Sequence, residues 1–349
     1  MAPRILLHGS GAIGTVYLYL FLKAGCEVTA VCRSNYEAAK QNGFTLDSGR
    51  YGKGIKITPT NVVRSPAEAV SLLGKDQYFD YVVVCTKALP EAKTAETIKP
   101  AVTIRETTIV LIQNGIGIED EYASTFHENP ILSCVVYLPT TQTSPGHIEM
   151  PGFELLEVGT FPSSAYKSSP ATQQACDTFI STTGKGGSNV HFYPDIQEQR
   201  WSKLLLNASW NPICALTLSR DVAFLASSPA AERLVLDVMD EVIAVARALG
   251  YERFTHELAQ TQLTKATNRK GGKGIEPSML VDVLTERRME VEVILGKPIE
   301  VARRVGVAVP RMETLYALGK ALDEAVALRE QGKSLAGDET RAARGELSA

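Results

Sequence analysis

The sequence predicts an α/β protein, with a doubly wound parallel sheet in its N-terminal half and an all-α domain after it. Short apolar runs alternate with helical patterns in the first half, which is typical of strand–helix units in a parallel sheet. Long helical patterns replace this alternation from about Asp195, and a length of 349 residues suits two domains. We therefore expect domains over 1–194 and 195–331, followed by a disordered polar tail over 332–349.

Apolar periodicity and turn residues define the elements in order. The first domain should contain strands at Ile5–His8, Val28–Cys32, Tyr81–Cys85 and Ile109–Ile112, with helices at Ala12–Ala24, Asn35–Asn42, Leu89–Ile98 and Ile118–Phe126. Residues 43–63 resemble a hairpin with its turn at 47–49, and residues 131–161 are rich in strand and turn patterns, with one turn at 144–146. The second domain should contain helices at Gln197–Leu216, Pro229–Leu249, Phe254–Lys265 and Ser278–Leu295, and a mobile loop at Lys270–Gly274.

Composition excludes several classes of protein. A formal net charge of −3 gives no general attraction to nucleic acid or to an anionic membrane. No apolar run approaches the roughly 20 residues of a membrane-spanning helix, and the N-terminus does not resemble a signal peptide. The scattered cysteines and histidines lack the spacing of metal ligands or redox pairs. We expect a cytoplasmic protein with reduced core cysteines, no metal site and a small-molecule substrate.

The segment HGSGAIG predicts a dinucleotide site. It follows an apolar strand, precedes an apolar-periodic helix, and contains the spacing G-x-G-x-x-G. The first glycine would permit a tight turn, the second a close approach of the diphosphate, and the third close packing of the helix. The free N–H groups of the helix N-terminus would bind the diphosphate in a Rossmann-type domain. The residues expected to bind the cofactor here are Gly9, Ser10, Gly11, Ala12, Ile13 and Gly14.

The ends of three further predicted strands also carry polar residues. Arg33 follows the second strand, where NAD-binding proteins commonly have an acidic residue, and it can pair with a 2′-phosphate. This favours NADP (NADPH) as cofactor, although Arg33 could instead be an ordinary surface residue. Lys87 and Asn114 follow the next two strands, and the carboxyl ends of strands bind ligands in open α/β sheets. We expect both side chains at the nicotinamide end of the site.

The predicted helix RWSKLLLNASWNPICAL carries three polar residues at a spacing of four, namely Lys203, Asn207 and Asn211. This spacing places all three side chains on one helical face. An ammonium group can neutralise and protonate an oxygen that gains negative charge, and carboxamides can hold hydroxyl and carbonyl groups. Alternatively, Lys203 could be a solvated residue, and Asn211 could end the helix because it precedes Pro212.

This combination of motifs resembles the ketopantoate reductase family. The glycine loop, TK after one strand, QNG after the next and K-x-x-x-N-x-x-x-N-P match it, as does PSMLVDVLTERRMEVEVILGKPIEVARRVGVAVPRMETLY. The resemblance extends from Ile5 to about Leu322. It implies that Lys203 is the general acid, that Ser278 contacts the substrate carboxylate, and that Glu290 orients the substrate or the lysine. Asn114, Asn207 and Asn211 would line the substrate site in a cleft between the domains, with Lys87 beside the cofactor.

The resemblance implies NADPH-dependent reduction of 2-dehydropantoate to pantoate, by a chain that could form a homodimer through its helical domain. The loop before Ser278 departs from the family, which often has an asparagine there; Asn268 could replace it. The substrate could therefore be another 2-oxo acid or an imine. A non-catalytic NADP-binding sensor or partner protein is a further alternative. Glu290 lies in a charge-rich stretch that would otherwise be a solvated helix face.

Overall fold

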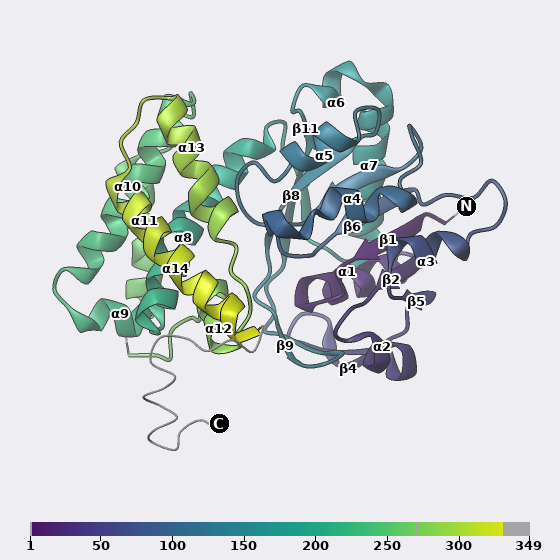
Figure 1. The fold of residues 1–349 in the computed structure, drawn as a ribbon, viewed down its shortest axis with the longest axis horizontal. Helices are drawn as coiled ribbons and strands as arrows, with labels where there is room; N and C mark the ends of the chain where they lie inside the picture. Colours follow the sequence, from purple (N-terminus) through teal and green to yellow (C-terminus); the bar gives the residue numbers. More distant parts are fainter. Residues whose placement is uncertain (1, 270, 331–349) are drawn as a thin grey trace. The chain divides into compact units, whose positions relative to one another are not determined.

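The computed structural model describes residues 2–269 and 271–330, so Lys270 and the predicted tail over 332–349 lie outside the described residues. The chain divides into two compact units, Met1–Arg200 and Trp201–Ala349. The division falls within helix α8 (Ile196–Thr217), a few residues beyond the predicted start of the second domain at Asp195. The predicted fold class is confirmed, with a mixed α/β sheet in the first unit and helices in the second (Figure 1).

The main sheet of the first unit has eight strands in the order β12-β11-β8-β7-β6-β1-β2-β5. Its strands are parallel except for the antiparallel pair β8 and β11. The order runs outward from β1 in both directions, so the crevice at the carboxyl ends of β1 and β6 is the topological switch point where ligands bind in such sheets. The strands are β1 (Arg4–His8), β2 (Glu27–Val31), β5 (Asn61–Val63), β6 (Tyr81–Val84), β7 (Thr108–Leu111), β8 (Ile131–Tyr137), β11 (Leu155–Phe161) and β12 (Val190–Phe192).

The central strands are buried because helices cover the sheet, which explains their continuous apolar sequences. Helices α1 and α7 pack closely together, and a Cβ on Gly186 of α7 would lie 2.1 Å from the Leu20 carbonyl oxygen of α1. Helices α3, α4 and α5 form a second contacting group. The helices of this unit are α1 (Ala12–Lys23), α2 (Tyr36–Asn42), α3 (Pro66–Ser71), η1 (Pro90–Ala92), α4 (Thr94–Ile98), η2 (Lys99–Ala101), α5 (Asp120–Thr125), α6 (Ala165–Ser168) and α7 (Pro170–Gly186).

A second sheet in this unit contains the predicted hairpin. Strands β3 (Phe44–Ser48) and β4 (Gly52–Ile57) pair antiparallel, with the turn two residues later than predicted. Strands β9 (Thr141–Ser144) and β10 (His147–Met150) pair antiparallel across the predicted turn at 144–146, and β10 joins β3 in parallel. The last part of the predicted hairpin segment instead forms β5 in the main sheet.

The second unit is built around helix α10, which contacts α9, α11, α13 and α14. Its apolar face is buried, including Val235, Val238 and Val242. The remaining elements after α8 are α9 (Asp221–Ser227), α10 (Ala231–Ala248), α11 (His256–Thr267), α12 (Ser278–Leu284), the π-helical segment η3 (Glu292–Gly296), α13 (Lys297–Arg304) and α14 (Pro310–Glu330).

Two predicted helices are interrupted, so those predictions are wrong in extent. The helix expected over Ser278–Leu295 ends at Leu284, and Glu286 has a φ of 53°. The buried Asp323 carboxylate holds the irregular segment that follows, because it accepts from the Met289 N–H at 2.7 Å and from the Arg288 guanidinium. The helix expected over Leu89–Ile98 breaks at Lys93, where φ is 44°.

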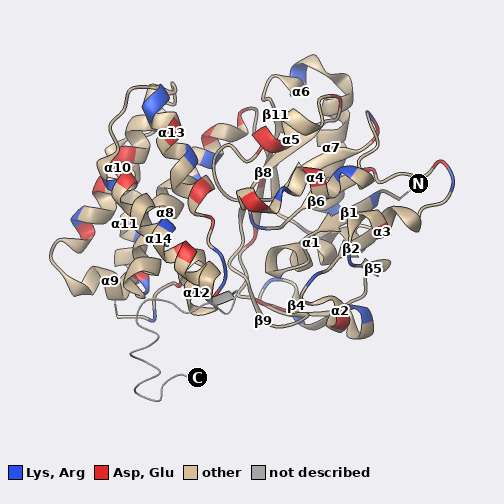
Figure 2. Ribbon diagram, in the orientation of Figure 1, with Lys and Arg blue, Asp and Glu red and all other residues tan. Residues whose placement is uncertain are grey.

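Charged residues of both signs are spread over the two units (Figure 2). Among the described residues, no helix is long and apolar enough to cross a membrane. The same ranges contain no group of three or more histidine, cysteine or acidic side chains that could hold a metal ion. All six cysteines are free thiols, and five of them are buried. Burial raises the pKa of Cys176 and of Cys214 to about 12, so these thiols stay protonated at neutral pH.

Candidate functional site

The glycine loop lies at the switch point of the main sheet, between β1 and α1. Gly9 has a φ of 101°, and a Cβ there would lie 2.7 Å from the Thr86 nitrogen after β6. A Cβ on Gly14 would lie 1.9 Å from the Gly9 carbonyl oxygen. Any side chain at Gly9 or Gly14 would therefore displace backbone, which explains why both positions are glycine.

Gly11 faces open space instead, because a Cβ there would meet nothing within 4 Å. Helix α1 begins directly after Gly11, and its first turn contains no acidic residue. The first N–H groups of a helix have no partner within the helix and attract anions. The space beside Gly11 thus offers donors and a favourable field to a diphosphate, as the sequence predicts.

The segment after β2 is tied to this loop by buried polar groups. The Asn35 amide donates to the Ser10 carbonyl at 2.7 Å, and the Ser10 hydroxyl donates to the Val31 carbonyl at 3.2 Å. Arg33 lies between these two contacts in the sequence and is exposed. Burial, and then the charge of Arg33, lower the pKa of His8 to about 4, so the charge of Arg33 acts at the end of β1. Arg33 is therefore available to an anion beside the glycine loop.

The loops that carry Lys87 and Asn114 are joined directly. The Gln113 side chain after β7 donates to the Thr86 carbonyl after β6 at 2.9 Å. Lys87 and Asn114 each follow one of these two residues, and both are half-buried. The carboxyl ends of β1, β6 and β7 thus meet around the glycine loop, as the sequence predicts for a ligand site in this type of sheet.

The same region contains unsatisfied polar atoms. The His8 Nδ1 and the Thr86 Oγ1 are buried and have no hydrogen-bond partner within the part of the chain that the structure describes. Buried polar atoms are normally paired, so two such atoms next to the glycine loop indicate a region that a polar ligand completes. The open space at Gly11, the exposed guanidinium of Arg33 and these atoms fit a bound dinucleotide.

In the second unit, Lys203, Asn207 and Asn211 lie on one continuous helix. Helix α8 runs through Pro212 to Thr217, so the alternative in which Asn211 ends the helix is wrong. Asn211 is 3% exposed, whereas Lys203 and Asn207 are half-buried. The three side chains therefore form a polar row along one face, as predicted from their spacing.

The row continues onto the neighbouring helix α12. The Ser278 hydroxyl, at the first residue of α12, donates to the Asn211 side-chain oxygen at 3.3 Å. Ser278 itself is exposed. The structure thus brings together Ser278 and Asn211, two residues that the sequence assigns to the substrate site from segments far apart in the chain.

Glu290 is buried, with 6% of its surface exposed, so the solvated-face alternative for this residue is wrong. It lies just before the π-helical segment η3 and not within a regular helix. Its neighbour Glu292 has a different environment, because it accepts from the Tyr316 hydroxyl at 3.1 Å and pairs with Lys320 at 3.0 Å. Glu292 therefore joins η3 to α14, whereas the predicted role at the substrate site belongs to Glu290.

Asp221 holds the unusual loop before Ser278. Its carboxylate accepts from the Ile275 N–H at 2.7 Å and pairs with Arg269 at 2.5 Å. Its own N–H donates to the Ile275 carbonyl at 3.3 Å. Ile275 is nevertheless 48% exposed, so the loop presents an apolar side chain three residues before Ser278. Asn268, the suggested replacement for an asparagine, is exposed at the end of α11.

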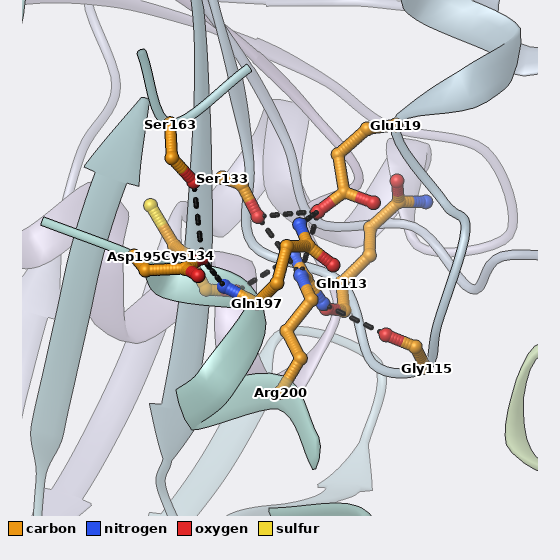
Figure 3. A network of polar contacts seen from close by, with 9 residues as sticks. All are labelled: Gln113, Gly115, Glu119, Ser133, Cys134, Ser163, Asp195, Gln197 and Arg200. Carbon is orange, nitrogen blue, oxygen red and sulfur yellow. Dashed lines mark hydrogen bonds and ion pairs between the residues drawn. The ribbon is translucent and has the colours of Figure 1, made fainter. Parts of the chain in front are cut away.

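Sequence reasoning missed a buried network at the start of α8 (Figure 3). Arg200 and Glu119 form an ion pair at 2.8 Å, with 2% and 1% of their side chains exposed. The Gln197 side chain donates to Glu119 at 2.8 Å, and Ser133 donates to it at 2.7 Å. No local pattern marks this network, because its members come from segments that are far apart in the sequence.

A sheet of this topology with a glycine loop at its switch point defines a dinucleotide-binding enzyme domain, here followed by a helical unit with a polar row. Family models described as "Ketopantoate reductase PanE/ApbA" and "Ketopantoate reductase PanE/ApbA C terminal" match residues 5–163 and 195–323. The chain belongs to the ketopantoate reductase family. It is an oxidoreductase that uses a nicotinamide cofactor.

Individual relatives agree with this assignment over almost the whole chain. An uncharacterised protein of Saccharomyces cerevisiae is 33% identical, and the match covers 90% of this chain and 92% of that protein. The crystal structure of 2-dehydropantoate 2-reductase from Methylococcus capsulatus has 32% identity and a TM-score of 0.77, and covers 95% of this chain and 99% of that one. A ternary structure of D-mandelate dehydrogenase with NADH and anilino(oxo)acetate shares the fold, with 20% identity, a TM-score of 0.78, and coverage of 93% and 99%.

Proposed function

We propose that this chain reduces 2-dehydropantoate to pantoate with NADPH. The polar row of α8 and α12 supports this proposal most directly, since it combines an ammonium with three neutral hydrogen-bonding groups in the second unit. When bound, the reduced nicotinamide would supply a hydride to the ketone carbon. The ketone oxygen then needs a proton, which the Lys203 Nζ donates as general acid.

The other groups of the row hold the substrate. Asn207 and Asn211 supply amide donors and acceptors for its hydroxyl and carbonyl groups. Ser278, whose hydroxyl donates to Asn211 in the structure, would turn this single O–H to the carboxylate of the bound substrate. Glu290 supplies a buried carboxylate, which in this proposal orients the substrate or Lys203, the role that the family resemblance gives it.

The choice of NADPH rests on Arg33. Its guanidinium is exposed beside the glycine loop, to which the buried Asn35 ties this segment. A guanidinium binds a 2′-phosphate through charge-assisted hydrogen bonds, and no acidic side chain stands in the four-residue stretch 32–35 to favour the free ribose hydroxyls.

A second candidate is the reduction of another 2-oxo acid with an apolar side chain. The exposed Ile275, held in place by Asp221, favours this candidate, because it offers an apolar surface near Ser278. The fold alone does not decide between them, since D-mandelate dehydrogenase shares it.

The test is NADPH oxidation with ketopantoate beside a panel of branched and aryl 2-oxo acids and cyclic imines. Preference for ketopantoate supports the proposal, whereas faster turnover of another 2-oxo acid replaces the substrate and keeps the mechanism. The Lys203→Met variant should lose at least about 100-fold in turnover and still bind cofactor. Lys297→Met, at a half-buried lysine paired with Glu300 at 2.9 Å, is the matched control and should leave turnover unchanged. An unchanged rate in Lys203→Met would remove Lys203 from the mechanism.

A further inference from the structure

The loop that carries Asn114 has a backbone that needs support. Gly115 has a φ of 99° and Gly117 a φ of 70°, both in the left-handed region. Glycines with this conformation lose more freedom on folding than other residues, so such a loop does not hold a side chain in one direction by itself. Asn114 is directly followed by the first of these glycines.

Arg200 provides this support through the backbone on both sides of Asn114 (Figure 3). Its Nη1 donates to the Gln113 carbonyl at 3.0 Å and to the Gly115 carbonyl at 3.0 Å. A single nitrogen atom thus holds the carbonyls of residues 113 and 115, so the peptide plane before Asn114 and the plane after Gly115 are fixed relative to each other. This restricts the backbone rotations of Asn114 and Gly115 between them, and with them the direction of the Asn114 side chain.

The rest of the guanidinium fixes Arg200 itself. Its Nη2 donates to the Cys134 carbonyl of β8 at 3.1 Å, and its Nε lies 2.8 Å from both the Ser133 hydroxyl and the Glu119 carboxylate. A buried charge is tolerated when it is paired and its donors are satisfied, and both conditions hold here. The planar fork of an arginine can bind all these groups at once, which a lysine cannot do.

We propose that Arg200 is a positioning residue for the reaction, which holds Asn114 in the direction that the bound cofactor and substrate require. It acts through the backbone of the 113–115 loop and touches neither ligand. This inference rests on the proposed function, in which Asn114 contributes to the ligand site. A lysine at position 200 keeps the charge beside Glu119 but releases at least one of the two flanking carbonyls.

The test separates positioning from stability. Arg200→Lys should retain the fold and bind NADPH within about threefold of wild type, while the single-turnover rate of hydride transfer falls at least about tenfold. The double variant Glu119→Leu/Arg200→Leu removes both charges of the ion pair. Its melting temperature should therefore exceed that of Arg200→Leu alone, in which the buried Glu119 has lost its cationic partner. Its hydride-transfer rate should remain low. A wild-type rate in either folded variant would overturn the proposal.

A double-mutant cycle gives a second readout. In an Asn114→Ala background, Arg200→Lys should slow hydride transfer no further, because it acts only through Asn114. Additive losses would show a purely structural role and overturn the proposal. The control is Glu241→Gln, at a buried carboxylate that accepts from the Met312 N–H at 2.9 Å; it should lower the melting temperature without changing the hydride-transfer rate.

Amide hydrogen exchange keeps this inference distinct from the proposed function. Exchange over residues 113–119 should be at least about tenfold faster in Arg200→Lys than in wild type, whether or not any 2-oxo acid is reduced. If wild type proves inactive on the whole panel, the proposed function fails while this measurement still reports on the loop. Unchanged exchange in this segment would overturn the positioning role.

Discussion

The open space beside Gly11 allows a sharp test of the cofactor site, through the variant Gly11→Ala. The backbone of Gly11 has a φ of −80° and a ψ of −157°, an extended conformation at the edge of the β region whose negative φ is open to alanine. The added methyl group would meet no protein atom within 4 Å. The free energy of unfolding should therefore stay the same or rise by about 0.4–1 kcal/mol, because alanine restricts the unfolded chain.

Cofactor binding should respond in the opposite way. If the diphosphate approaches the backbone at Gly11, the methyl group occupies its space and breaks at least one hydrogen bond to a charged group. Such a bond contributes about 1.5–3 kcal/mol, so the dissociation constant of NADPH should rise about 10- to 150-fold. Urea unfolding and calorimetric titration measure the two quantities on the same sample.

The neighbouring variant Gly14→Ala separates the two effects. Its Cβ would lie 1.9 Å from the Gly9 carbonyl oxygen, so backbone must move and both stability and affinity should fall. Gly319→Ala in α14 meets only ordinary contacts at 3.6 Å and should leave NADPH binding unchanged. A Gly11→Ala protein of normal stability that binds NADPH within twofold of wild type would refute a diphosphate at this position.

Three other outcomes are expected. Arg33→Glu should weaken NADPH far more than NADH in titrations, because it replaces the partner of the 2′-phosphate with a repelling charge; equal effects would contradict that pairing. Ile275→Asn should shift the ratio of kcat/KM values about tenfold away from apolar 2-oxo acids and toward ketopantoate, since the contact it removes is apolar; a constant ratio would place Ile275 outside the substrate site. As the pH falls from 6.5 to 4, the free energy of unfolding of wild type should decrease by about 3 kcal/mol more than that of His8→Leu. Urea titrations at each pH measure this difference. The sign follows because the pKa of His8 is about 4 in the folded state, so protons bind the unfolded chain first as pH falls. Parallel pH profiles for the two proteins would show that His8 titrates normally.

Features that depend on neighbouring residues could be predicted from the sequence. The strand that ends at His8, the three glycines and the spacing of Lys203, Asn207 and Asn211 each lie within one continuous segment, where periodicity and backbone preference act directly. Helix α8 also continues through Pro212, which local preference alone disfavours, because the packing of a long apolar helix outweighs one missing N–H group.

Features that depend on distant partners could not be predicted. Glu290 lies in a charge-rich stretch that predicts a solvated helix, yet it is buried and lies outside a regular helix. The deciding contact comes from Asp323, which takes the Met289 N–H that a helix would otherwise use. In the sequence, nothing distinguishes Arg200 from the other charged residues near the start of its helix. Its hydrogen-bond partners lie 66 to 87 residues earlier in the chain.

These distant contacts share one physical arrangement. Loops that carry predicted site residues are held by buried side chains that bond to their backbone: Asn35 holds Ser10, Arg200 holds the carbonyls around Asn114, and Asp221 holds Ile275. Glycines and open loops allow a ligand to approach the backbone, but they leave that backbone free to change conformation. A hydrogen bond from a buried amide or charged group fixes the backbone without filling the space that the ligand needs. Conservative substitutions at these holding residues should therefore impair the step that the held loop serves, either ligand binding or turnover, more than their small changes in volume suggest. Their partners are backbone atoms, so no complementary side-chain pattern in the sequence identifies them.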